Sequence, residues 1–381
     1  MGLSPQLEHD FRSNLGVYLT LCGMALGSPG FASEPMVPNA YSELRVIEFP
    51  LHTDPSGVPL TVELNRLQIA DPEFPGAGID LGFLRFRSQH PGTPVILIGD
   101  DDLESSSLAS GRANILVQAL LASGDVIALD RRGIGTSSAQ SPCLRAIAYA
   151  LDAPLEAAPF AQALGRWMVE CGTFWADEGL HLDQFSLPYA VRDVDRVRNA
   201  IGAERVVIIG YGSGAEIAWG AAAAEPDRVI GVVELIPPRT YPISASKLPR
   251  QIKVVTDAAS VTVGVGNGDL LLASADAHAT AAIDSGDWDK LGVFLIDSRS
   301  RIARPNPARI AFDASLPATY DAFLSDAARR VIEGRSIDRP QIRTHSIQIT
   351  NADVEDPGVI DRVSAFVASA AKSPDTPPRK E

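Results

Sequence analysis

The segment Val206–Glu216 has residue types at a spacing that could support nucleophilic chemistry. Its sequence, VVIIGYGSGAE, is an apolar run followed by a glycine-rich turn and the start of a helix. A sharp strand–turn–helix connection of this kind presents its central residue for attack on a carbonyl and has room only for small residues two positions to either side. If Gly210 and Gly214 take those flanking positions, the centre is Gly212, which has no attacking atom. The pattern therefore predicts a turn that could position a nucleophile but has no nucleophilic side chain at its centre.

Ser213 is the neighbouring residue with a nucleophilic side chain. It would take the central position only if the turn moved by one residue, and that frame puts Tyr211 where a small residue is required. The other role for Ser213 is that its backbone N–H faces the place where a negatively charged oxygen develops. The sequence leaves both roles open.

Strand and helix patterns on both sides of the turn indicate the elements that position it. Unbroken apolar runs are typical of parallel strands buried on both faces, here at 94–99, 125–130, 205–209 and 229–235. Helical spacing follows at 109–122, 189–201 and 214–224, and again at 357–371. Alternating patterns predict antiparallel edge strands at 45–49, 60–65 and 81–88. This alternation predicts an α/β fold with a doubly wound, mostly parallel sheet.

Three motifs support a family resemblance. Asp130–Ser137 has the pattern D-x-R-G-x-G-x-S, Tyr189–Gly202 is similar to a D-x-x-x-x-R-x-x-L-G helix, and Glu225–Val229 contains P-x-R-V. Together they resemble the α/β-hydrolase superfamily and, within it, the secreted proline-iminopeptidase and tripeptidyl-aminopeptidase branch. The resemblance covers roughly residues 90–300 and implies the α/β-hydrolase fold with a lid inserted after the sixth strand.

Residue patterns and composition, together with the resemblance, predict six segments along the chain. We expect a signal peptide at 1–32, a linker at 33–43, the core at 44–236, the lid at 237–289, the C-terminal part of the core at 290–371 and a disordered tail at 372–381.

The loop Gly99–Ser105, with the sequence GDDDLES, lies where the family has its second oxyanion donor. Carboxylates of Asp100 and Asp101 at this place would repel the negative charge that the site should stabilise. Two further interpretations stay open. The loop could hold a cation through Asp100, Asp102 and Glu104, or it could be a solvated loop that caps the next helix.

The family's acid and base are expected near the C-terminus. One frame treats 347–357 as the strand-then-acid stretch, with Asp353 or Asp356 as the acid, and the last strand with its Gly-His loop is then missing. The other frame treats 346–350 as that last strand, which leaves His345 before the strand as the late histidine. Either frame predicts an incomplete triad.

The N-terminal apolar run 15–26 and the small residues at 30–32 resemble a secretory signal with a cleavage site. Removing Cys22 with that signal would leave Cys143 and Cys171, an even count that favours one disulfide in an oxidising compartment. Both cysteines also lie where the resembling branch has them. The alternative is two small buried apolar residues. We therefore expect a secreted or periplasmic protein with no stable membrane insertion after cleavage.

Composition excludes several classes of partner. The net charge of −14 argues against nucleic acid, because phosphate binding needs a basic surface. The chain has no CxxC, HExxH or Walker loop, so no metal or cofactor is expected. We expect a catalytically degenerate protein that binds a small molecule or short peptide in a lid-covered pocket. The alternatives are an active serine hydrolase that uses Ser213 with Asp353 or His345, and a purely structural role.

Overall fold

The computed structural model describes residues 42–51, 60–74, 78–100, 104–111, 113–137, 143, 146–147, 153–236, 249–255, 260–266, 269, 273, 277–302, 308, 311–312, 345–349 and 354–372. Contacts divide the chain into two compact units. The core unit consists of Val37–Ser141, Gly179–Pro238 and Asp338–Glu381. The second unit consists of Met1–Met36, Pro142–Glu178 and Arg239–Ile337.

The core unit contains an eight-stranded sheet with the strand order β1-β2-β3-β5-β4-β6-β7-β10. Its strands are β1 Ser42–Leu51, β2 Leu60–Ala70, β3 Gly78–Phe86, β4 Val95–Ile98, β5 Val126–Leu129, β6 Val206–Tyr211, β7 Val229–Leu235 and β10 His345–Ile349. The strands from β5 to β10 in this order run parallel, and β1, β2, β3 and β5 are joined antiparallel. The predicted mostly parallel sheet with antiparallel strands at one edge is confirmed.

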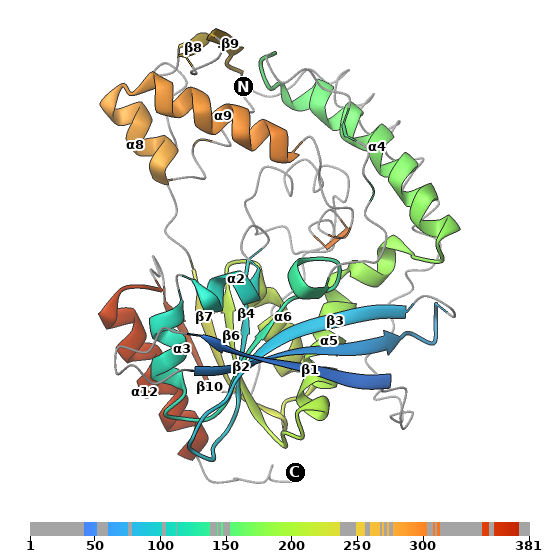
Figure 1. Cartoon of the computed structure of the whole chain (residues 1–381), viewed down its shortest axis with the longest axis vertical. Helices are drawn as coiled ribbons and strands as arrows, with labels where there is room; N and C mark the ends of the chain where they lie inside the picture. Colours follow the sequence, from blue (N-terminus) through green and yellow to red (C-terminus); the bar gives the residue numbers. More distant parts are fainter. Residues whose placement is uncertain are drawn as a thin grey trace, which may run out of the picture. The chain divides into compact units, whose positions relative to one another are not determined.

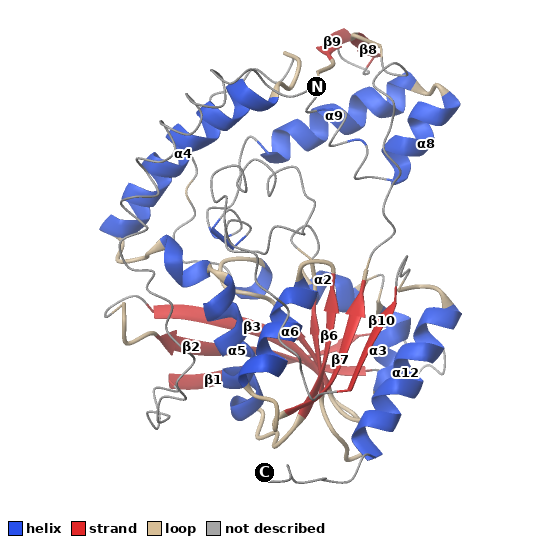
Figure 2. Ribbon diagram, turned by 180° about the vertical axis from the view of Figure 1, so that it is seen from behind, coloured by secondary structure: helices blue, strands red, loops and turns tan. Residues whose placement is uncertain are grey.

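Helices cover both faces of the parallel strands (Figures 1 and 2). Helices α3 Asn114–Leu120 and α12 Pro357–Lys372 pack together on one face, and α5 Leu187–Ala200 and α6 Gly214–Ala224 pack on the other. Every residue of β4, β5 and β6 is buried. Because both faces are covered, these strands have continuous apolar runs in place of alternation.

The sequence predicts one helix over 109–122. The structure instead has two shorter helices in this region, so the prediction of a single helix is wrong. Helix α2 Ser105–Ser110 ends at Gly111, whose N–H donates a hydrogen bond to Ser107 O at 3.0 Å. Helix α3 begins at Asn114. Glycine is a poor residue for a helix interior and suits a helix end. Helical spacing continued across Gly111, so the periodicity alone did not show the break.

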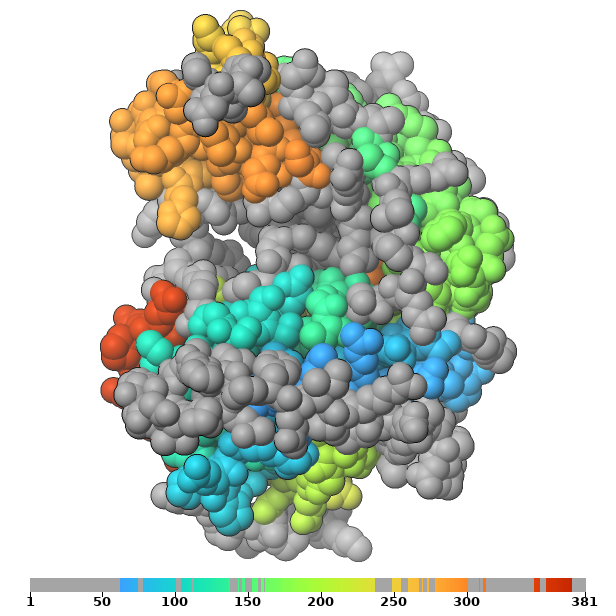
Figure 3. All heavy atoms as spheres, in the orientation of Figure 1, coloured from blue at the N-terminus to red at the C-terminus, as the bar shows by residue number. Residues whose placement is uncertain are grey.

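The second unit contains α4 Ala157–Asp177, the hairpin β8 Gln251–Val255 and β9 Ser260–Gly264, and the helix pair α8 Ala277–Ser285 and α9 Trp288–Ile302. Helices α8 and α9 lie side by side (Figure 3). The contacts place α4 and α9 in this unit. The segment boundaries expected from sequence stay a prediction.

A fully buried ion pair joins three segments of the second unit. Arg299 donates from Nη2 to Asp269 Oδ2 at 2.6 Å, and both side chains have no solvent exposure. Asp269 also accepts hydrogen bonds from the backbone N–H of Leu155 and of Gly266. One buried carboxylate thereby connects the segment before α4, the end of the hairpin and α9.

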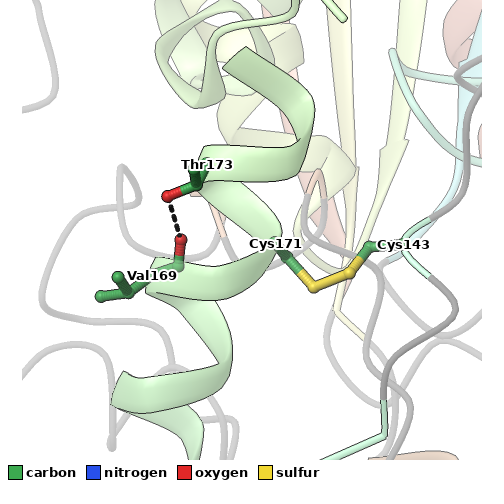
Figure 4. Close-up of a disulfide and its surroundings, with 4 residues drawn as sticks. All are labelled: Cys143, Val169, Cys171 and Thr173. Atoms are coloured by element: carbon green, nitrogen blue, oxygen red, sulfur yellow. Dashed lines mark hydrogen bonds between the residues drawn. A yellow bond between two sulfur atoms is a disulfide. The ribbon is translucent and has the colours of Figure 1, made fainter. Parts of the chain in front are cut away.

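The predicted disulfide between Cys143 and Cys171 is confirmed (Figure 4). Cys171 is fully buried on α4 and packs in an apolar cluster that includes Leu164 and Trp167. Disulfides persist mainly in oxidising compartments, so this bond is compatible with an extracellular location. Among the described helices, none has the length and apolar character needed to cross a bilayer.

A thiol titration tests the disulfide directly. In the full 381-residue chain, which keeps Cys22, we expect one reactive thiol in denaturant without reductant and three after reduction. A Cys143→Ser variant serves as the control, since it should expose two thiols without reductant. Three reactive thiols in the unreduced wild type would contradict the disulfide.

Candidate functional site

The predicted strand–turn–helix connection is present between β6 and α6. Strand β6 ends at Tyr211 and α6 begins at Gly214. Gly212 lies in the turn with φ +58°, the left-handed region that favours glycine, and its N–H donates to Leu235 O at 3.0 Å. This bond fixes the turn at the carboxyl edge of the sheet, next to the end of β7.

Close approach of backbone explains the small residues on both sides of the turn. A Cβ added to Gly210 would lie 2.5 Å from the backbone N of Ala215, and one added to Gly214 would lie 2.6 Å from the carbonyl oxygen of Gly99. Real Cβ atoms do not come this close to backbone. The structure therefore places Gly212 at the centre of the turn, with the spacing that the sequence predicted.

The carboxylate of Asp100 fills the space beside Gly212. A Cβ added to Gly212 would lie 2.8 Å from Asp100 Oδ1 and closer still to its Oδ2 and Cγ. The backbone N–H of Ser213 donates to Asp100 Oδ1 at 3.0 Å. An acidic side chain from the β4–α2 loop thus lies where a side chain at position 212 would project.

The rest of that loop is held at its two ends. The Gly99 N–H donates to Ser105 Oγ at 2.8 Å, and Ser105 Oγ donates in turn to Leu129 O. Asp101 and Asp102 lie outside the described residues, so the interpretations that depend on them stay predictions. Glu104 occupies the N-cap position of α2 without a side-chain capping bond. Asp100 interacts instead with the start of α6. Within the described ranges there is no cluster of metal-ligating side chains.

Ser213 has ordinary helical geometry. Its φ of −62° and ψ of −23° belong to the right-handed helical region, and the residue is 1% exposed. Its Oγ has no hydrogen-bond partner in the part of the chain that the structure describes. The contact of Ser213 with the neighbouring loop is made by its backbone N–H, which donates to Asp100.

Strand β10 lies beside β7 and runs parallel to it. His345 is opposite Gly231, whereas Ile349 is opposite Leu235 at the edge that carries the turn. About 13 Å of strand separates the His345 backbone from that edge, at roughly 3.3 Å per residue. Asp353 lies outside the described residues, and no strand follows α12 in the part of the chain that the structure covers.

The motif Asp130–Ser137 supports the site without entering it. Asp130 is buried and accepts hydrogen bonds from the N–H and Oγ of Ser106 and of Thr136. These bonds connect the start of α2 to the loop that follows β5. The motif therefore holds in place the helix that follows the Asp100 loop.

Arg132 from the same motif is buried between two carboxylates. It donates to Asp71 at 2.5 Å and to Asp193 at 2.5 Å, and Arg196 bonds to both carboxylates from the partly exposed side. Asp71 comes from the loop after β2, which sequence reasoning did not connect with this motif. A buried arginine signals such acidic partners, but it does not say where in the chain they are.

A family model described as alpha/beta hydrolase fold matches residues 106–255, which run from α2 to β8 and include the β6–α6 turn. The chain has the α/β-hydrolase fold. The sheet order, the flanking helices and the turn after β6 agree with this assignment. No curated protein sequence matches the chain.

The chain is similar to several solved structures at low identity. An epoxide hydrolase from an endophytic Streptomyces is 19% identical, with a TM-score of 0.29, over 46% of this chain and 38% of that one. The N-acyl homoserine lactonase AidH, in complex with N-butanoyl homoserine, is 14% identical over 78% of this chain and 96% of that one, with a TM-score of 0.36. A probable hydrolytic enzyme from Pseudomonas aeruginosa is 12% identical over 81% of this chain and 82% of that one, with a TM-score of 0.38.

Proposed function

We propose that this α/β-hydrolase-fold chain is catalytically degenerate and acts as a binding protein for a small molecule or short peptide. The observation that carries the proposal is Gly212 at the centre of the β6–α6 turn, where a hydrolase needs its nucleophile. Glycine offers no atom that can form an acyl intermediate. The turn, the sheet edge and the loops around it remain, and such edges of α/β sheets are common places for ligands.

The origin and location of the chain are part of the same proposal. The motifs at 130–137 and 189–202 support descent from the secreted proline-iminopeptidase branch. The apolar run at 15–26 and the Cys143–Cys171 disulfide support export. The inserted residues would act as the lid over a ligand pocket, and the net charge of −14 disfavours nucleic acid as the ligand.

One observation favours a second candidate, an active serine hydrolase that uses Ser213. The Ser213 hydroxyl has no partner within the described residues, so no bond would have to break before it reacts. Its 1% exposure and helical backbone oppose this role, because an attacking oxygen must reach the substrate. The register of β10 also places the His345 backbone opposite Gly231 and not at the edge that carries the turn, which opposes His345 as the base.

Hydrolysis assays separate the two candidates. We expect purified wild type to give no turnover of short nitrophenyl esters or aminoacyl-naphthylamides above the rate of a Ser213→Ala variant. A serine-directed fluorophosphonate probe should label neither protein. Turnover by wild type that Ser213→Ala abolishes would overturn the degenerate assignment and establish the second candidate.

The binding half of the proposal has its own measurement. A ligand that binds the folded state raises the melting temperature in a concentration-dependent way. We expect such a rise with at least one member of a series of short peptides and small esters. No shift across the series, at concentrations up to several millimolar, would count against a small-molecule or peptide ligand.

A further inference from the structure

We infer that the segment Asp71–Phe74 after β2 is a strap that opens and closes on the part of the chain that enters the core unit. The chain leaves the second unit at Glu178 and enters the core unit at Gly179. The strap lies more than a hundred residues earlier in the sequence and contacts the residues that follow this point. The inference goes beyond the proposed function, because it uses no residue of the β6–α6 turn.

The Asp71 end of the strap is bound inside the core unit. Asp71 is 2% exposed, and its carboxylate accepts hydrogen bonds from the guanidinium groups of Arg132 and Arg196. Arg132 also donates to the backbone oxygen of Gln184 at 3.1 Å, in the short 3₁₀ helix η2 Leu182–Phe185. Separating a buried carboxylate from its cations is strongly destabilising, so this end stays in place while the other end moves.

The Phe74 end of the strap is held by contacts at the surface. Its ring stacks on the His181 imidazole with the centroids 4.9 Å apart, and it lies 5.8 Å from the Tyr189 ring. Glu73 pairs with Arg192 at 2.9 Å, and these two side chains are 47% and 41% exposed. Exposed ion pairs contribute little to stability, and segments with few buried contacts open at low free energy. This end can therefore open while the sheet stays folded.

A buried amide donor in η2 favours the opening. Gln184 is fully buried, and its Oε1 accepts the His181 N–H at 2.9 Å. Its Nε2 has no hydrogen-bond partner within the described residues. A buried donor without a partner destabilises the closed form, and water reaches this donor once η2 loosens. The gain offsets part of the cost of opening.

Opening of the strap lengthens the link between the two units. Gly179 follows the end of α4 with φ +77°, and nothing lies within 4 Å of a Cβ added there. With the strap closed, the ring stack and the backbone bond of His181 hold the chain two residues later. With the strap open, the next fixed element is α5, which begins at Leu187. The strap therefore sets how much chain is free to move between the units.

Hydrogen exchange of the full chain, followed by mass spectrometry, tests the inference. The amides of Gln184 and Ser186 donate to backbone oxygens at 3.0 and 3.1 Å and report the opening of η2. We expect Phe74→Ala to speed their exchange about tenfold, because the ring stack is lost, while the amides of β6 keep wild-type rates. Phe74→Leu takes its place if Phe74→Ala does not fold, since it keeps an apolar side chain without the ring.

Ile115→Ala is the matched control for the loss of an apolar surface side chain. Ile115 is 58% exposed on α3 of the same unit, so its replacement should leave the exchange of η2 unchanged. Salt gives a second readout. Raising the ionic strength to about 1 M screens the Glu73–Arg192 pair and should speed the exchange of η2 in wild type. In Glu73→Gln the exchange should be faster at low salt and should no longer respond to salt.

Three results would overturn the inference. Unchanged exchange of η2 in the Phe74 variants would mean that the strap does not hold this helix. Equal acceleration of η2 and β6 would mean that the variants destabilise the whole unit. Exchange of η2 at the rate of β6 in wild type would mean that the segment opens only when the core unit unfolds.

Discussion

Replacing Gly212 by alanine is expected to lower the free energy of unfolding by about 2–5 kcal/mol. A residue with a Cβ in the left-handed region costs about 1–2 kcal/mol, and forcing extra atoms into a filled space costs about 1–3 kcal/mol more. Here the filled space is the Asp100 carboxylate, which lies too close to the added Cβ. Urea denaturation of the two proteins measures the difference.

Gly202→Ala is the matched control for this prediction. Gly202 has φ +70°, and nothing lies within 4 Å of an added Cβ, so this variant should show only the backbone cost. In a double-mutant cycle, Asp100→Ala should recover about 1–3 kcal/mol of the Gly212→Ala loss. Equal losses for Gly212→Ala and Gly202→Ala, with no coupling to Asp100, would contradict the contact.

The same contact bears on attempts to restore catalysis. The side chain of a serine at position 212 would clash with the Asp100 carboxylate. Gly212→Ser alone is therefore a poor test of whether the turn can still position a nucleophile. The test needs the double variant Gly212→Ser/Asp100→Ala. The nucleophile position and the loop that faces it have to be changed together.

Replacing Arg132 by methionine is expected to cost about 3–5 kcal/mol, because it leaves two buried carboxylates without their central cation. Burial alone would raise the pKa of Asp71, yet the hydrogen bonds and charges of Arg132 and Arg196 hold that pKa below its ordinary value. Chemical denaturation near neutral pH measures the loss. Arg192→Met is the control, since the Arg192–Glu73 pair is exposed and should contribute at most about 1 kcal/mol.

The Arg132 variant should also change the pH dependence of stability. With a lowered pKa in the folded state, Asp71 contributes stability that is present above its unfolded pKa and is lost as the pH falls through the folded pKa. Without Arg132, the carboxylate can relieve its burial by taking up a proton. The gap between wild type and Arg132→Met should therefore narrow as the pH falls through about 4 and below, where wild type also loses the Asp71 contribution. A gap that stays constant over this range would mean that Asp71 does not depend on Arg132.

Local patterns along the chain determined much of the fold. The apolar runs at 94–99 and 205–209 predicted strands buried on both faces, because strands covered on both faces consist mainly of apolar residues. The glycines at 210 and 214 predicted the turn, because the close backbone approach that requires them is set within a few residues. The Cys143–Cys171 bond was also predicted, on the expectation that Cys22 is removed with a signal peptide and leaves these two cysteines as a pair.

The tertiary structure alone decided which distant residues meet. Asp100 was expected to repel charge at an oxyanion site, but only the fold shows that its carboxylate lies against Gly212 and bonds to Ser213, 113 residues away. His345 is a predicted candidate base, and only the register of β10 shows that its backbone lies opposite Gly231. Contacts of this kind depend on strand order and register, which are fixed by packing across the whole sheet. The local spacing of residues therefore does not predict them.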